Sequence, residues 1–215
     1  MDRRKALKNM GLAMGYTVAT PTLISIMQSC KGETVAQWTP EFFTQAEGSV
    51  ITKLVDIIIP KTDTLSASEV QVDLFIDKFS QDVMEKENQD FFKMTMGKFI
   101  DKALKDSGKE NAQDLTPEDL EPVLASALKH SKEDQAKMSE SITTYNEAVA
   151  EGKSATLDEG TSLFAFANNL RGLTIWGYKT SEYVGEEVLA YLPVPGEYIG
   201  CGDAQELSQG KAWSL

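Results

Sequence analysis

The sequence has one histidine and two cysteines among its 215 residues, and it lacks the spaced motifs that hold cofactors. It contains no HExxH, no CxxC or CxxCH and no glycine-rich phosphate loop. Two widely separated cysteines and a single distant histidine do not make a structural zinc site. We therefore expect no metal site and no flavin or nicotinamide site in this chain, and no catalytic residue can be named.

Positive charge is also scarce. The chain has 21 Lys and Arg against 33 Asp and Glu, a net charge of −12, and basic residues cluster only within the first eight positions. Because phosphate binding needs clustered Lys and Arg, this pattern argues against nucleic acid as a partner. The hydrophobic share of 41% is ordinary and predicts a soluble domain with a real core.

The N-terminus has the layout of an export signal, which we assign to residues 1–29. Arg3 and Arg4 open a basic stretch, and a moderately apolar run follows from Met10 to Met27. This run is too polar and too interrupted for a membrane-spanning helix. The paired arginines resemble a twin-arginine signal, whose route exports folded proteins, although Ala6 stands where that pattern prefers Phe. An ordinary leader with two chance arginines is the alternative.

The two cysteines allow two exclusive interpretations. Met27-Gln28-Ser29-Cys30 resembles a loose lipobox, in which Cys30 becomes the lipidated first residue of the mature protein. Alternatively, Cys30 forms a disulfide with Cys201 in an oxidising compartment. A chain this acidic would reach an anionic membrane only through such a lipid. Residues 30–38 are short and polar and suit a tether.

Residues 39–215 predict an all-α fold, a compact single-domain helical bundle, because apolar residues recur at spacings of three and four with no long alternation. Thr39-Pro40-Glu41 is expected to open the first helix, which Pro60 ends. Thr116 and Ser131 are expected to cap two later helices, and His130 follows Lys129 at a helix end, where a cation is favourable. The expected inward stripes are Val50, Ile51, Leu54, Val55, Ile58; Val72, Phe75, Ile76, Phe79, Val83; Phe92, Met96, Phe99, Ile100, Ala103; Leu120, Val123, Leu124, Ala127, Leu128; Met138, Ile142, Tyr145, Val149; and Leu163, Phe166, Ala167, Leu170, Thr174.

The C-terminal segment is rich in Pro, Gly and aromatic residues and is predicted to be extended. Thr180 or Ser181 is expected to cap a short helix through Leu189, and Pro193-Val194-Pro195-Gly196 predicts a tight turn. Aromatic residues on such a backbone suit a partner surface, or they cover one end of the bundle. The sequence leaves both interpretations open.

Two ordered motifs resemble one protein family. The first is Ile58-Ile59-Pro60-Lys61-Thr62-Asp63-Thr64, followed by Ala67 and Val72-Asp73-Leu74-Phe75-Ile76-Asp77, and the second runs from Gly177 to Glu182 and on through Pro195 to Cys201. Both are similar to signatures of the gluconate 2-dehydrogenase subunit 3 family. Leu65-Ser66 stands where that family usually has Pro-Gly. The candidate partner contacts are Asp63, Trp176, Tyr178, Lys179, Thr180, Ser181, Glu182, Pro195, Tyr198 and Cys201.

The resemblance implies a small, noncatalytic, periplasmic accessory subunit. In that family the FAD belongs to a large dehydrogenase subunit of the glucose-methanol-choline type, which oxidises a sugar or sugar acid, and a cytochrome c subunit often takes the electrons. The small subunit carries the twin-arginine signal and helps its partner mature and be exported. Two other classes stay open: a lipid-tethered protein that binds a small sugar-like ligand, and an enzyme in its own right.

Overall fold

The computed structural model describes residues 39–192, 196 and 201–214, and the chain from Pro40 onward forms one compact unit. The predicted export signal with Arg3 and Arg4, the tether with Cys30, and the turn residues Pro195 and Tyr198 lie outside the described residues. Within the described residues, no helix is both long enough and apolar enough to cross a bilayer.

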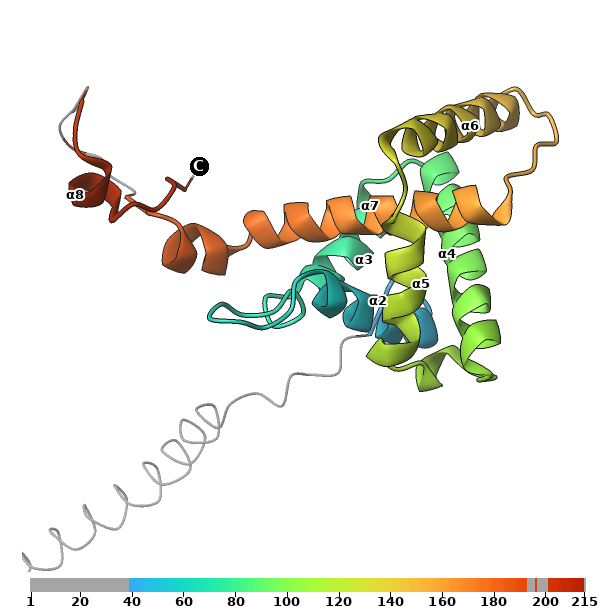
Figure 1. Cartoon of the computed structure of the whole chain (residues 1–215), viewed down its shortest axis with the longest axis horizontal. Coiled ribbons are helices and arrows are strands. Elements are labelled where there is room, and N and C mark those ends of the chain that lie inside the picture. Colours follow the sequence, from blue (N-terminus) through green and yellow to red (C-terminus); the bar gives the residue numbers. More distant parts are fainter. Residues whose placement is uncertain (1–38, 193–195, 197–200, 215) are drawn as a thin grey trace, which may run out of the picture. The chain divides into compact units, whose positions relative to one another are not determined.

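The described chain is helical, which confirms the all-α prediction (Figure 1). Its only extended pairing within these residues is an isolated bridge between Ala190 and Trp213. The helices, with two short helical turns labelled η, are α2 (Gln45–Ile58), α3 (Val72–Asp82), α4 (Lys86–Ser107), η1 (Ala112–Asp114), α5 (Pro117–Leu128), α6 (Lys132–Ala150), α7 (Glu159–Lys179), η2 (Val184–Val188) and α8 (Ala204–Ser208).

The core forms around α7, which packs against α2, α3, α4, α5 and α6 (Figure 1). The predicted stripes of α4 and α7 are buried in full, and Phe166 of α7 lies between Phe92 and Phe99 of α4, with ring centroids 5.5 and 5.0 Å away. Such close packing of large side chains supplies most of the burial that stabilises a helical domain of this size.

The first helix begins five residues later than predicted. Its N-cap is Thr44, whose hydroxyl accepts from the Glu47 N–H while the Glu47 carboxylate accepts from the Thr44 N–H at 2.8 Å. The residues after Thr39 stay non-helical because the buried Asp77 carboxylate of α3 accepts their N–H groups. The donors are Glu41 at 2.8 Å and Phe42 and Phe43 at 3.0 Å.

The inward stripe predicted for α6 is wrong, since no residue of α6 is buried. Met138, Ile142 and Tyr145 are half-buried and Val149 is exposed. Although Ser131 caps this helix as predicted, α6 packs mainly along one side of α7 and therefore lies on the rim of the core. Val83 was also predicted inward, but it follows the last residue of α3 and is 63% exposed.

Candidate partner interface

The seam between α3 and α7 brings the two sequence motifs together. Gly177 of α7 is buried against Phe75 of α3, and a Cβ atom at Gly177 would lie only 2.6 Å from the Phe75 ring. Trp176 lies edge-on to Phe75 and Phe79, with ring centroids 5.1 Å from each. Only glycine allows this close approach of the two helices at position 177, and Trp176 nevertheless remains 47% exposed.

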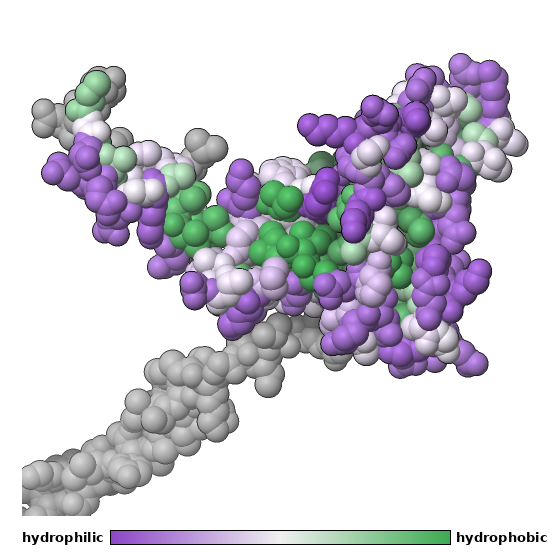
Figure 2. Space-filling view, in the orientation of Figure 1, coloured by the Kyte–Doolittle hydropathy of each residue, from purple (hydrophilic) through white to green (hydrophobic). Residues whose placement is uncertain are grey.

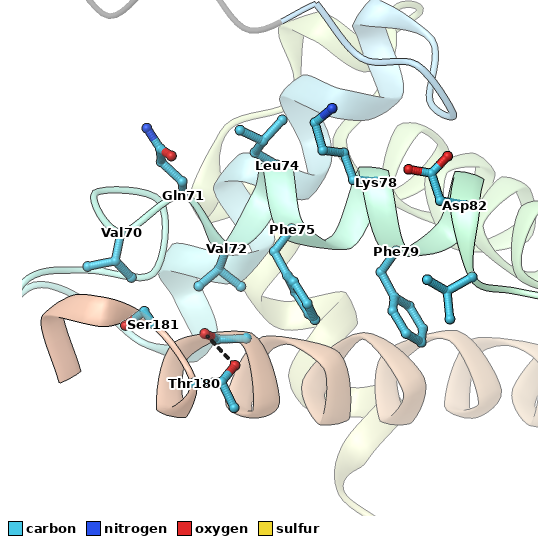
Figure 3. A pocket seen from close by; sticks show the side chains of 12 residues that line it. Val70, Gln71, Val72, Leu74, Phe75, Lys78, Phe79, Asp82, Thr180 and Ser181 are labelled. Carbon is cyan, nitrogen blue, oxygen red and sulfur yellow. Dashed lines mark hydrogen bonds between the residues drawn. The ribbon is translucent and has the colours of Figure 1, made fainter. Parts of the chain in front are cut away.

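A groove of about 460 Å³ runs along this seam. Figure 3 shows Phe75 and Phe79 pointing toward α7, while Gln71, Leu74 and Lys78 point away from it. Val83 also lines the groove, and Figure 3 shows Asp82 toward one end of the view and Ser181 toward the other. The groove is largely apolar and open, which suits contact with another apolar surface.

Two tyrosines tie the loop between α2 and α3 to the end of α7. The Tyr178 hydroxyl donates to the Leu65 carbonyl at 2.7 Å, and the Tyr183 hydroxyl accepts from the Leu65 N–H at 3.3 Å. The N–H and the C=O of Leu65 are therefore both satisfied by side chains from a segment more than 110 residues away. Tyr178 is half-buried and has a defined role in holding this loop.

Further polar contacts fix the loop from within. The Asp56 carboxylate accepts from both the N–H and the hydroxyl of Ser68, at 2.8 and 2.6 Å. The Glu69 carboxylate accepts from Lys61 and from the Ser66 N–H, and these bonds, that of Lys61 first, lower the pKa of Glu69. Asp63 lies exposed in this loop, available for contact with a partner.

Glutamates line a second groove, beside Tyr183. Its volume is also about 460 Å³, and its lining includes Glu69, Glu182, Glu186 and Glu187. The last three are exposed and lie in or next to η2. This side of the seam therefore carries concentrated negative charge, which favours a basic surface on any partner.

The remaining predicted contacts that the structure describes are Lys179, Thr180, Ser181 and Cys201. Lys179 and Thr180 are exposed, and Ser181 is half-buried and caps the short helix by accepting from the Val184 N–H at 3.3 Å. This agrees with the cap predicted there, although η2 ends at Val188. Cys201 is exposed. Figure 2 shows hydrophobic side chains at the surface over α7 and over the segment that follows it.

No group of three or more His, Cys, Asp or Glu side chains in the described part of the chain could hold a metal ion. His130 lies just after α5, edge-on to Phe164 with centroids 5.9 Å apart, so its ring covers part of α7. The features that the structure shows around α3 and α7 are apolar contacts, the loop between α2 and α3 held by hydrogen bonds, and exposed carboxylates.

Sequence reasoning missed several residues of this region. Tyr183 was not selected, and Phe75, Phe79 and Val83 were assigned to the core, because periodicity alone cannot tell a helix face that meets a neighbour from one that borders a groove. The long-range bonds of Tyr178 and Tyr183 to Leu65 have no signal in the sequence.

A helical body that exposes an apolar seam beside an acidic groove is typical of proteins that bind another protein. The chain belongs to the gluconate 2-dehydrogenase subunit 3 family, whose model matches residues 45–196. It is therefore a member of a family of dehydrogenase-complex subunits, as the sequence motifs indicated. Comparisons with curated proteins and with solved structures gave no match.

Proposed function

We propose that this chain is the noncatalytic accessory subunit of a periplasmic, FAD-dependent sugar or sugar-acid dehydrogenase of the glucose-methanol-choline type. The observation that carries the proposal is the family match over residues 45–196. In this proposal the large subunit holds the FAD and oxidises the substrate, and a cytochrome c subunit accepts the electrons. The accessory chain supports maturation of the large subunit.

The export part of this proposal rests on the N-terminal signal. Arg3 and Arg4 would be recognised by the twin-arginine route, which carries folded proteins, so the large subunit would cross the membrane already bound to this chain. Cys30 would then anchor the complex in the periplasm through a lipid. The exposed seam around Trp176 supports a role in which the body binds a folded protein.

Co-purification tests the complex. An affinity tag inserted between Lys153 and Ser154 would lie in an exposed loop, well separated in sequence from the seam residues and from both termini. Gently solubilised cells should yield the tagged chain together with one large polypeptide and a flavin absorption spectrum. A colourless, solitary chain at native expression would contradict a stable complex. Heat of binding to sugars or sugar acids by the purified chain alone would instead indicate a ligand-binding protein.

A second experiment tests export. The Arg3→Lys/Arg4→Lys variant keeps the charge but removes the arginine pair, so it should leave the flavoprotein in the cytoplasm. The matched control is Lys5→Arg/Lys8→Arg, which should export normally. Fractionation followed by flavin measurement in each compartment reads the result. Normal periplasmic arrival of the flavoprotein in the first variant would show that the partner does not travel on this signal.

A further inference from the structure

The C-terminal arm, defined here as residues 189–192 and 201–214, keeps its large hydrophobic side chains at the surface. Tyr191, Leu192, Leu207 and Trp213 are between 40% and 51% exposed. They line a common cavity of about 290 Å³, so they are neighbours rather than scattered residues. Clustered exposed hydrophobic residues of this kind mark surfaces that a partner covers.

The backbone of the arm is held in a defined arrangement. The Ala190 N–H donates to the Ala212 carbonyl at 2.8 Å, and the Ser214 N–H donates to the Ala190 carbonyl at 2.9 Å. Lys211 donates to the Glu187 carbonyl at 3.2 Å, which joins the chain end to η2. Side chains presented on a backbone that is already ordered lose less entropy when they bind, which favours their use as anchors.

The arm is not part of the core that α7 organises. Within the described residues, α2 to α7, η1 and η2 each pack against another helix. The short helix α8 does not pack extensively against any of them. Packing between these helices therefore does not bury Leu207 of α8 or Trp213. Within the described residues these two side chains stay 40% and 48% exposed and offer a surface to a partner.

The charge of the residues around the arm indicates which kind of surface binds there. Between Lys179 and Lys211, the second of which also lines the cavity, the sequence has no Lys, Arg or His but has six acidic residues, namely Glu182, Glu186, Glu187, Glu197, Asp203 and Glu206. A second copy of this chain, with its net charge of −12, would be repelled, and an anionic lipid surface or a nucleic acid would be repelled as well. The complementary surface is an apolar patch with Lys and Arg around its edge.

We propose that the arm and the adjoining η2 dock on the catalytic flavoprotein subunit, with Tyr191, Leu192, Leu207 and Trp213 in an apolar patch and with Glu186 and Glu187 of η2 facing Lys or Arg side chains at its edge. This inference rests on the proposed function, which supplies the partner. The matched family residues end at position 196, so Leu207 and Trp213 lie beyond them.

Two variants test the surface in the full chain carrying the tag between Lys153 and Ser154. Leu192→Ser/Trp213→Ser removes two apolar anchors, and Glu186→Lys/Glu187→Lys reverses the charge. Each should reduce the flavin recovered per tagged chain by about tenfold or more, since buried aromatic anchors and complementary charges dominate such interfaces. The matched controls are Val149→Ser and Glu140→Lys/Glu147→Lys on exposed positions of α6, which should recover wild-type flavin.

Cross-linking identifies the contact directly. A carbodiimide joins a carboxylate to a lysine amine without a spacer, so Glu186 or Glu187 should become linked to lysines of the flavoprotein. Links between two copies of this chain at these glutamates would overturn the choice of occupant and indicate self-association. Circular dichroism checks folding, and if the apolar variant is unfolded, the charge variant decides, because both glutamates are exposed.

The outcomes separate the two proposals. If the wild-type chain recovers the flavoprotein and the arm variants recover it equally well, the docking surface is wrong and the accessory function stands. If the α6 controls lose the flavoprotein as strongly as the arm variants, the arm has no special role and the inference also fails. If the wild-type chain recovers no flavoprotein at all, the proposed function fails and the inference falls with it.

Discussion

Phe166 in the helical body and Trp213 in the C-terminal arm are both large aromatic residues, but their surroundings differ. Phe166 is fully buried between two rings of α4, whereas Trp213 is 48% exposed on a short extended segment. In the body, helices contribute apolar faces to a common core, and α7 is covered on several sides. In the arm, apolar side chains gather at the surface around a common cavity, which is the arrangement expected for the docking surface proposed above.

The largest expected effect comes from emptying the core. Phe166→Ala should lower the free energy of unfolding by about 3–5 kcal/mol, because it leaves a cavity between Phe92 and Phe99. Trp213→Ala, the matched change in the arm, should alter it by less than about 0.5 kcal/mol. Urea titrations followed by circular dichroism measure both. Equal losses would show that the arm is part of the same cooperative core.

The next largest effect concerns Asp77, which holds the entry of the chain into the body. Asp77→Ala leaves the N–H groups of Glu41, Phe42 and Phe43 without their acceptor and should cost about 3 kcal/mol. Asp82→Ala, at an exposed position of the same helix, is the control and should be nearly neutral. The same urea titration applies. A mild effect of Asp77→Ala would mean that water replaces the carboxylate easily.

A smaller effect is expected where the seam is tightest. Gly177→Ala places a methyl group 2.6 Å from the Phe75 ring and should cost about 1–3 kcal/mol through overpacking. Gly172→Ala in the same helix meets nothing within 4 Å and should instead stabilise the protein by about 0.5–1 kcal/mol. Thermal unfolding of the two variants gives the comparison. A stabilised Gly177→Ala protein would show that Phe75 moves aside freely.

The smallest expected effects on stability come from a change of pH, which titrates single carboxylates at the starts of helices in the body. Hydrogen bonds from Lys109 and Thr116 lower the pKa of Asp119 to about 2, and bonds from Thr161 lower the pKa of Asp158. Partial burial alone would raise the pKa of Glu47, but bonds from Lys93 and Thr44 outweigh it and lower the pKa. Each lowered pKa means that the ionised form stabilises the folded state.

This stabilisation is fully present above the usual pKa values of 3.8 for Asp and 4.5 for Glu, and it is lost as the pH falls toward about 2. Burial raises the pKa of Asp73, so this group acts in the opposite sense and offsets part of the loss. Urea titrations between pH 5 and about pH 2.5 should show falling stability, with a shallower fall in Asp119→Asn. An unchanged slope in that variant would exclude Asp119 as a contributor.

Much of the body could be predicted from the sequence. The stripes of α4, α5 and α7 follow from 3.6-residue periodicity, and Thr116 and Ser131 stand at helix starts because their side chains bond to groups in the first turn. The start of α2 could not be predicted, because Thr39-Pro40-Glu41 and Thr44 to Glu47 are both reasonable starts. Asp77, more than 30 residues away, decides between them.

The candidate interface was predicted less completely. Trp176 and Tyr178 were both predicted as partner contacts, but the sequence could not separate a side chain that faces outward from one that holds the fold. Trp176 remains half-exposed, whereas Tyr178 binds Leu65, and only the placement of α7 beside the loop makes this distinction. The same reason explains α6, whose apolar stripe is regular although no neighbouring helix covers it fully.

By itself, the sequence determined the helical class, the starts of α5 and α6, the acidic charge and the family, because these depend on residue types and on spacings within one segment. The tertiary structure decided which apolar residues are buried, where the first helix begins, and that Gly177, Trp176 and Phe75 form one seam. These outcomes depend on contacts between segments far apart in the chain. Local patterns limit such contacts, but only the packing of whole helices selects among them.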